Sequence, residues 1–449
     1  MTGSGGVGHY YNRAAGGGWY HGGKYRIGKR VMESEERSTA AWLTLVGIGE
    51  DGVAGLGEAA RAAVADAEFV FGGTRHLALA TALIRGEAMA WPSPLHEGIE
   101  RLLTLRGRRV CVLASGDPFH YGVGTTLAAR IDAGEMRVLP ACSSFALACA
   151  RLGWAQQTTR LVSLHGRAFS ALNASLHNGV RLLALTDGAE SPPQIARLLA
   201  ARGMGASRVT VLEALGGDSE RLSHFTADEL SATEMAFHAL NTVAIEVVQG
   251  GGDAVGSLCP GRAETLFEHD GQITRRDVRA MTLGRLSPRP GERLWDVGAG
   301  AGSIAIEWLL SDERLAAVAI ERDAERCARI QRNAERFGVP RLTVVEGEAP
   351  QALAGLEAPH AIFIGGGVSD MTLMARCFDA LAPGGRLVAN AVTLESELAL
   401  GECQRLLGGE LTRLSLEHTA PLGGMTGWTP SRTLTQWCWH KPHDFRGEA

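Results

Sequence analysis

The sequence predicts an α/β protein with two successive folded regions, the first built on two sheets and the second on one doubly wound sheet. Short apolar runs typical of buried strands alternate with helix-like stretches throughout residues 41–248 and 263–442. Most of these runs end in glycine, serine or an acidic residue, which is expected where parallel strands meet ligands at their carboxyl ends. A polar linker with three consecutive glycines, 249–262, separates the two regions.

Composition describes a globular chain whose surface carries little net charge. The 449 residues suggest roughly two to three domains. A net charge of -5 argues against a general nucleic-acid or anionic-membrane surface. No apolar run reaches the roughly 18 residues that cross a bilayer, and a signal-peptide core is absent, so we expect a cytoplasmic protein with no membrane partner. The 8 cysteines form no C-x-x-C pair, so we expect neither a metal site nor disulfides.

Residues 1–40 do not resemble the rest of the chain. They are glycine-rich with scattered aromatic residues and no periodicity, a composition that cannot offset the entropy of ordering. We expect this segment to be disordered. It is either a misannotated extension, with translation starting at Met32, or a true flexible tail.

The first folded region opens with an expected strand at 42–49, which runs into Gly47 and Gly49. A helix-like stretch at 57–67 and a short strand at 68–73 follow. Expected strands then follow at 109–114, 138–144, 161–166, 182–187, 209–212 and 242–248, with helices at 192–202 and 227–237.

The second folded region is expected to begin with a helix at 275–286, with Thr274 as its N-cap and Asp277 at the third helical position. An amphipathic pattern predicts another helix at 323–337. Around a central strand that ends at Asp296, the expected strands are 316–321, 342–345, 361–364, 386–390 and 433–437.

The central feature of the second region is the stretch 294–307, LWDVGAGAGSIAIE. It predicts a buried strand, a tight turn at Gly298, Gly300 and Gly302, and the start of a helix. Glycine is needed where the backbone takes positive φ and a ligand approaches closely. The sequence therefore predicts a nucleotide-like ligand over this turn.

Two kinds of ligand are consistent with this turn. A dinucleotide code places the third glycine where this chain has Ser303, and it does not explain Asp296. Asp296 supplies negative charge where a dinucleotide site would need positive charge, so a ligand without phosphate is the other possibility. The expected strand 316–321 ends in Glu321, whose carboxylate can accept both ribose hydroxyls of either ligand.

The pattern D-x-G-x-G-x-G resembles the first motif of class I S-adenosylmethionine-dependent methyltransferases, which implies a Rossmann-like domain. By this resemblance the cofactor-binding residues of the second region are Asp296, Gly298, Gly300, Gly302, Glu321, Gly347, Glu348 and Ala349.

Four motifs of the first region resemble those of the tetrapyrrole methylase family: GIGEDG at 47–52, ASGDPFHYG at 114–122, PACSSF at 140–145 and SLHGR at 163–167. The resemblance implies two α/β subdomains with S-adenosylmethionine in the cleft between them. Two departures are Glu50, where many members have proline, and Cys142. The implied cofactor-binding residues are Gly47, Gly49, Gly116, Asp117, Pro118, Tyr121, Ser143 and Ser144.

The second region resembles the C15-methylating, decarboxylating domain of cobalamin biosynthesis through DGQITRRDVRA, WDVGAGAGSIAIE, AIERD, EGEAP, FIGGG and VANAVTLE. With both halves in this order, the chain resembles the bifunctional precorrin-6Y C5,15-methyltransferase (decarboxylating) family. This implies methylation of precorrin-6Y, or its cobalt equivalent, at C5 by residues 41–248. Residues 263–442 would methylate C15 and decarboxylate the ring C acetate, giving precorrin-8X. It also implies two S-adenosylmethionine sites and a homo-oligomer formed through the second domain.

An anionic tetrapyrrole needs cations for its carboxylates, and arginine suits such pairing. Methyl transfer to an enamine-like meso carbon depends mainly on positioning, so no strong base is required and the catalytic residues stay unassigned. Candidate substrate-binding residues are His165, Arg167, Gln272, Thr274, Arg275, Gly366 and Asn390, with Arg276 and Arg432 as further possibilities. Asn390 and Glu395 are near the strand end where decarboxylation is expected, and neither is assigned a proton-transfer role.

Two alternatives stay open at this point. One is an NAD-linked oxidoreductase that uses the Gly298 turn. The other is a protein in which one half binds cofactor or substrate without catalysis.

Overall fold

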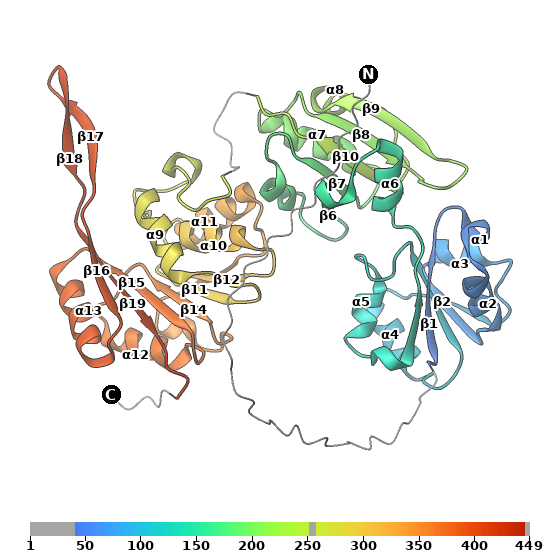
Figure 1. Ribbon diagram of the computed structural model, residues 1–449, viewed down its shortest axis with the longest axis horizontal. Helices are drawn as coiled ribbons and strands as arrows, with labels where there is room; N and C mark the ends of the chain where they lie inside the picture. The colour runs from blue at the N-terminus through green and yellow to red at the C-terminus, as the bar shows by residue number, and fades with distance from the viewer. Residues whose placement is uncertain (1–40, 251–256, 445–449) are drawn as a thin grey trace, which may run out of the picture. The chain divides into compact units, whose positions relative to one another are not determined.

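The computed structural model describes residues 41–250 and 257–444. Over those residues the chain forms two five-stranded sheets, one seven-stranded sheet and a two-stranded hairpin (Figure 1). The α/β class predicted from the sequence is confirmed. The expectations for residues 1–40, and for the linker at 251–256, lie outside the described residues. No helix of the described ranges is long and apolar enough to span a membrane.

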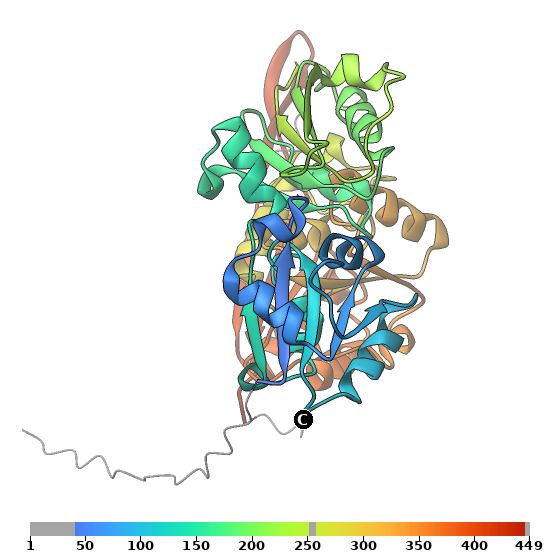
Figure 2. The same cartoon turned by 90° about the vertical axis from the view of Figure 1, so that its right-hand side faces the viewer.

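The first sheet is parallel throughout, in the order β3-β2-β4-β1-β5. Alternate residues of β4 enter two cores, because Val112 packs with α4 and α5 while Leu113 packs with α2 and α3. Figure 2 shows this sheet, in blue to teal, with helices against it. Its elements are β1 Leu43–Ile48, α1 Gly52–Gly55, α2 Glu58–Asp66, β2 Phe69–Gly72, α3 Thr74–Ala80, β3 Glu87–Ala90, α4 Leu95–Leu103, β4 Val110–Ser115, α5 Val123–Ala128 and β5 Met136–Leu139.

The second sheet is mixed, with the order β6-β7-β10-β8-β9, and only its β6–β7 pair is parallel. The sequence analysis missed β9 and made the helix at 227–237 too long. That helix ends at Ser231 because Phe237 packs on Phe225 and the His238 N–H donates to buried Glu213 at 2.6 Å. The elements are α6 Ser144–Leu152, β6 Arg160–Ser163, β7 Arg181–Leu185, α7 Ser191–Ala201, β8 Arg208–Glu213, β9 Arg221–Thr226, α8 Ala227–Ser231 and β10 Asn241–Glu246.

The third sheet has the order β13-β12-β11-β14-β15-β19-β16, parallel from β13 to β15 and antiparallel at β19 and β16. It is doubly wound, since Leu294 faces a core with α9, α10 and α11, and Trp295 faces a core with α12 and α13. Its elements are α9 Arg276–Leu286, β11 Arg293–Val297, α10 Ser303–Ser311, β12 Ala316–Glu321, α11 Ala324–Phe337, β13 Thr343–Glu346, β14 Ala361–Ile364, α12 Met371–Ala380, β15 Arg386–Ala391, α13 Leu394–Leu407, β16 Glu410–Leu414 and β19 Leu434–His440.

Short 3₁₀ turns connect these elements: η1 Ala133–Glu135, η2 Gln156–Thr158, η3 Phe169–Ser175, η4 Glu264–Leu266 and η5 Gln351–Leu353.

A β-hairpin between β16 and β19 was not expected from the sequence. It consists of β17 Glu417–Leu422 and β18 Met425–Pro430, and it projects well beyond the third sheet (Figure 1). Leu422, Met425 and Trp428 are exposed on it.

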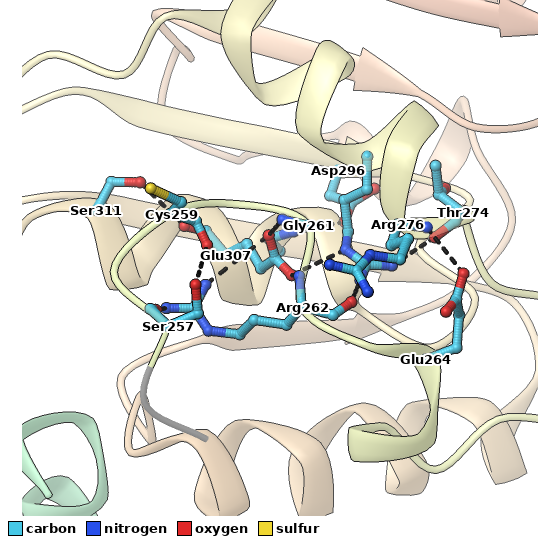
Figure 3. Close-up of polar contacts among 12 residues, drawn as sticks. Ser257, Cys259, Gly261, Arg262, Glu264, Thr274, Arg276, Asp296, Glu307 and Ser311 are labelled. Carbon is cyan, nitrogen blue, oxygen red and sulfur yellow. Dashed lines mark hydrogen bonds and ion pairs between the residues drawn. The ribbon is translucent and has the colours of Figure 1, made fainter. Parts of the chain in front are cut away.

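The N-terminus of α9 differs from the prediction. Its N-cap is Arg275 rather than Thr274, so Asp277 is the second helical residue and not the third. The cap comes from a distant residue, because Glu264 Oε1 accepts the Arg276 N–H at 2.9 Å (Figure 3). The Thr274 carbonyl instead accepts from the Arg279 guanidinium.

A fully buried ion pair joins α9 to α10. Arg279 Nε donates to Glu307 Oε1 at 2.9 Å, and both side chains are 0% exposed. The same carboxylate accepts the backbone N–H groups of Gly261 at 2.7 Å and Arg262 at 3.0 Å (Figure 3). The end of the linker is thereby fixed to the two helices that flank the glycine turn.

We predict that Arg279→Met destabilises the second region by about 3–5 kcal/mol, because the buried Glu307 carboxylate loses its hydrogen-bonded cation and keeps, as a cation, the Arg262 guanidinium at 3.8 Å. Urea unfolding followed by tryptophan fluorescence measures the loss. As a control, Arg314→Met breaks the exposed pair with Asp312, which water screens. The midpoint of its urea unfolding transition should equal that of the wild type. A wild-type midpoint for Arg279→Met would contradict the structural role of the pair.

Candidate functional site

A cavity of about 850 Å³ opens at the carboxyl ends of the parallel strands of the third sheet. Loops that follow β11, β12, β13, β14 and β15 line it, together with a segment before α9 and residues around the root of the hairpin. The crevice beyond the strand ends is where open α/β sheets bind their ligands. The sequence-predicted residues at the cavity are Gly298, Gly300, Glu321, Gly347, Glu348, Ala349, Gln272, Thr274, Arg275, Gly366 and Asn390.

The glycine turn after β11 has the backbone geometry predicted for it. Gly298, Gly300 and Gly302 have φ values of +72°, +57° and +74°, which side chains other than glycine rarely permit. A Cβ on Gly300 would lie 2.9 Å from the Gln272 carbonyl oxygen. The turn and the segment before α9 therefore approach each other too closely for any side chain at this position.

Glu321, at the end of β12, holds the turn and faces the cavity. Its Oε2 accepts the Gly300 N–H at 2.9 Å, and its Oε1 accepts the N–H groups of Arg322 at 3.0 Å and Asp323 at 3.2 Å. Each carboxylate oxygen has a second lone pair. Oε2 is therefore held in place with capacity for a hydroxyl donor from a ligand.

Asp296 and Gly302, also predicted to bind cofactor, are not among the residues that line the cavity. Asp296 is 1% exposed, and its Oδ2 accepts the Ala305 N–H at 3.0 Å at the start of α10. Its Oδ1 is buried with no hydrogen-bond partner among the described residues. Burial, with a smaller effect of Glu321, raises the pKa of Asp296 to about 7. A Cβ on Gly302 would meet Ile330 of α11 at 2.8 Å, so this glycine serves helix packing.

Residues 271–275 form one wall of the cavity, and hydrogen bonds and ion pairs fix this segment at both ends. Asp270 Oδ1 accepts the Gln272 N–H at 3.0 Å, and its Oδ2 pairs with Arg326 at 2.9 Å and Arg329 at 3.1 Å of α11. These donors hold the pKa of Asp270 well below its usual range. At the other end the Thr274 carbonyl accepts from Arg279. The wall is therefore built before any ligand binds.

Asn390, at the end of β15, is a buried polar group at the cavity. Gln436 Nε2 donates to its Oδ1 at 2.9 Å, and its Nδ2 donates to Thr282 Oγ1 at 3.3 Å. This arrangement fixes the orientation of the Asn390 amide. Sequence reasoning proposed Asn390 but could not find Thr282 or Gln436, which come from α9 and β19.

The residues that line the cavity differ in part from those proposed from the sequence. Arg432 lines the cavity, whereas Arg276 and Glu395 do not. Sequence reasoning did not propose several further cavity residues. Arg322 lies within the AIERD motif but was not assigned to the site, whereas the others belong to no quoted motif: Arg326, Leu414, Leu416 and His418. For Arg326, its position three residues after Asp323 at a helix start was the available signal.

In the first region, the predicted glycine and serine residues converge at the carboxyl edge of the first sheet. A Cβ on Gly47 would lie 1.8 Å from the Gly116 carbonyl oxygen, and one on Gly116 would lie 2.9 Å from Ser143 Cα. Ser143 caps α6, accepting the Ala146 N–H at 3.2 Å, and Ser144 begins that helix. Three of the four motifs thus meet through backbone contacts.

Tyr121 of the second motif and Arg167 of the fourth motif lie close together. The Arg167 guanidinium lies 5.4 Å from the centre of the Tyr121 ring. Tyr121 has a φ of +56°, a conformation that costs free energy for an aromatic residue and is concentrated at functional sites. Asp117 Oδ1 accepts the Phe119 N–H at 2.9 Å within the same loop. Pro118 is buried in that loop, and a Cβ on Gly49 would lie 2.7 Å from Asp51 Oδ1.

His165 pairs with Asp187 at 2.8 Å, and both side chains are exposed. A polar cluster of Glu50, Arg75, His76 and Ser115 at the edge of the first sheet was missed by the sequence analysis.

Comparison with known proteins gives two family matches. The model for tetrapyrrole (corrin/porphyrin) methylases matches residues 42–231, and the model for a precorrin methyltransferase domain matches residues 265–441.

Individual relatives match nearly the full length of the chain. It is 53% identical to precorrin-6Y C(5,15)-methyltransferase [decarboxylating] of Sinorhizobium sp, over 92% of this chain and 99% of the relative. It is 41% identical to the protein of that name from Mycobacterium tuberculosis, over 88% and 98%. Among solved structures, the C-terminal domain of precorrin-6Y C5,15-methyltransferase from Rhodobacter capsulatus is 48% identical, covering 41% of this chain and 100% of that chain with a TM-score of 0.40.

The raised pKa of Asp296 predicts a pH dependence of stability. The folded state binds the extra proton between the ordinary pKa of 3.8 and about 7, so the contribution of Asp296 to stability falls as pH rises through that window. The Asp296→Asn side chain cannot ionise. The melting temperature of this variant, relative to that of the wild type, should therefore rise between pH 5 and pH 8. Asp379→Asn, at an exposed position of α12, is the control. Parallel melting profiles for Asp296→Asn and wild type would show that Asp296 does not titrate in this way.

Proposed function

The chain belongs to the precorrin-6Y C5,15-methyltransferase (decarboxylating) family, and we propose that it methylates precorrin-6Y, or its cobalt equivalent, at C5 and C15 and decarboxylates the ring C acetate. The product is then precorrin-8X. We assign the C5 methylation to residues 41–248, and the C15 methylation with decarboxylation to residues 263–442. The observation that carries this proposal is a preformed nucleotide-type cavity on a chain whose full-length relatives carry that name.

We assign one S-adenosylmethionine to the cavity of the third sheet, where it supplies an electrophilic methyl group on sulfur. Gly298 and Gly300 give the backbone close approach, and Glu321 offers an acceptor for ribose hydroxyls. The Glu321 carboxylate at the cavity favours a cationic ligand over a phosphate. This charge arrangement supports the methyl donor against the dinucleotide that the glycine turn alone left open.

A second S-adenosylmethionine is assigned to the edge of the first sheet. The support is the convergence of Gly47, Gly116 and Ser143 through backbone contacts, beside the strained Tyr121. The lack of side chains at Gly47 and Gly116 brings the main chains of these motifs together at this edge of the sheet.

The substrate carboxylates require cations that are near the cavity and reachable. Arg275, Arg322 and Arg432 line it, and Arg322 is largely exposed with only a loose pair to Glu348 at 3.7 Å. Guanidinium groups can pair with carboxylates through two hydrogen bonds. We propose that these arginines hold the macrocycle over the methyl donor and that Asn390 donates to a substrate oxygen from its fixed amide.

We also propose that the chain forms a homo-oligomer through the second region, with the projecting β17–β18 hairpin in the interface. Leu422, Met425 and Trp428 are 70%, 79% and 69% exposed, and such apolar side chains on a two-stranded hairpin favour burial against a second copy.

We predict that the triple variant Leu422→Ser, Met425→Ser, Trp428→Ser lowers the oligomeric state measured by analytical ultracentrifugation. Leu95→Ser, on α4 of the first region, is the control and should sediment as the wild type. Unchanged sedimentation of the triple variant would place the interface elsewhere.

A side chain that fills the cavity of the third sheet tests whether C15 methylation and decarboxylation take place there. A Cβ on Gly366 meets no protein atom within 4 Å and this glycine lines the cavity, so Gly366→Leu should occupy ligand space without disturbing the fold. Mass spectrometry of the product should show loss of C15 methylation and of decarboxylation, with C5 methylation retained. Gly401→Leu, on α13 with equally open surroundings, should behave as the wild type. Retention of both methylations in Gly366→Leu would exclude this cavity as the C15 site.

A further inference from the structure

The polar cluster at the edge of the first sheet has a specific geometry. Glu50 follows β1, Arg75 and His76 begin α3 after β2, and Ser115 is the last residue of β4. Both β1 and β2 pair with β4, so three neighbouring strand ends bring these side chains together. The cluster borders the two glycine turns to which we assign the first methyl donor.

The hydrogen bonds define the tautomer of His76. Arg75 Nη2 lies 2.9 Å from Ser115 Oγ and 3.0 Å from His76 Nε2. A guanidinium only donates, so His76 Nε2 accepts and the neutral ring carries its proton on Nδ1. Ser115 Oγ lies 2.8 Å from the same Nε2.

Two further facts distinguish His76 from a structural histidine. Its Nδ1 is buried without a hydrogen-bond partner in the described part of the chain, an arrangement that costs free energy. Burial, with a smaller effect of Arg75, lowers the pKa of His76 to about 4, so its ring is neutral at neutral pH. Glu50 pairs with Arg75 and offsets its charge. The exposed Ser115 hydroxyl therefore lies beside a neutral ring nitrogen that carries no proton and whose one lone pair accepts a hydrogen bond from Arg75.

We propose that Ser115 and His76 take up the proton that leaves C5 during methylation of that meso carbon. This inference rests on the proposed function of the first region. The carbon–carbon bond forms with an electron pair from the macrocycle, and the methyl–sulfur bond breaks toward sulfur. The macrocycle is then cationic. The C5–H bond next breaks, its electrons return to the ring system, and the proton passes to Ser115 Oγ. Arg75 Nη2 gives up its hydrogen bond to His76 Nε2 and donates to Ser115 Oγ alone, so the Ser115 hydroxyl proton passes to the lone pair of Nε2.

A weak acceptor is sufficient for this step. A hydrogen on a carbon next to a cationic conjugated system is acidic, so a neutral imidazole can accept it. Burial and the neighbouring Arg75 disfavour the imidazolium that results. The proton therefore returns readily to water, and the ring is reset for the next turnover.

The test uses the full chain and a substrate that carries deuterium at C5. Methyl gain and deuterium release are followed together by mass spectrometry for the wild type, Ser115→Ala, His76→Ala and the control His96→Gln, an exposed position of α4. We expect Ser115→Ala and His76→Ala to slow deuterium release on the order of 10²-fold and to show a primary isotope effect absent from the wild type. Added imidazole should restore deuterium release in His76→Ala. Circular dichroism and thermal melting of each variant report whether the first region is folded, and C15 methylation in the same reaction reports that the second region is active.

Wild-type deuterium release in both variants would overturn the inference. So would slower C5 methylation with no isotope effect and no imidazole rescue, because that pattern indicates a structural role. A wild-type chain that methylates C15 but never C5 would instead overturn the proposed function of the first region, so the two failures are distinguishable.

Discussion

The buried carboxylate of Glu307 is the constraint on which the second region depends. It binds Arg279 of α9 and the backbone N–H groups of Gly261 and Arg262, so it joins α10 to the end of the linker. Arg279 in turn holds the Thr274 carbonyl. The wall at 271–275 is therefore set at a fixed distance from the glycine turn. A buried ion pair of this kind contributes little net stability compared with apolar packing, but removing one partner is costly. Its value here is the position that it gives to the cavity wall.

Both halves have closely packed glycine turns at their strand ends, but the charged residues near the turns differ. In both, glycines allow backbone segments to approach within distances that side chains forbid. The second region places the Glu321 carboxylate at its turn, and Arg275, Arg322 and Arg432 line the same cavity. The first region places a charge-balanced group of Glu50, Arg75 and a neutral His76 beside its turns. The two strand-end regions therefore present different polar groups.

The sequence could predict those parts of the fold that depend on local pattern. The strands from β1 to β15 that end in glycine or acidic residues, and the positive φ of Gly298 and Gly300, follow from residues close in the chain. The sequence could not predict contacts that form only in the folded protein. The cap on α9 comes from Glu264, which competes successfully with Thr274 because η4 lies beside the helix start.

The same reason explains the missing site residues. Arg326 reaches the cavity because Asp270 fixes it from another loop, and Gln436 orients Asn390 from an antiparallel strand. The His76 cluster lies at three strand ends, and the order of these strands in the sheet cannot be predicted from any single motif. The motif that contains Asp296 was recognised. The burial of the Asp296 side chain depends on how α10 packs, and the spacing of residues in the motif could not predict it.

The central claim is that both halves bind the same methyl donor. Isothermal titration of the intact chain with S-adenosylhomocysteine, with NADH titrated separately, tests it most directly. The account predicts two equivalents of S-adenosylhomocysteine per chain, one of them lost in Gly366→Leu, and no binding of NADH. A single equivalent that survives in Gly366→Leu, or binding of NADH alone, would contradict it.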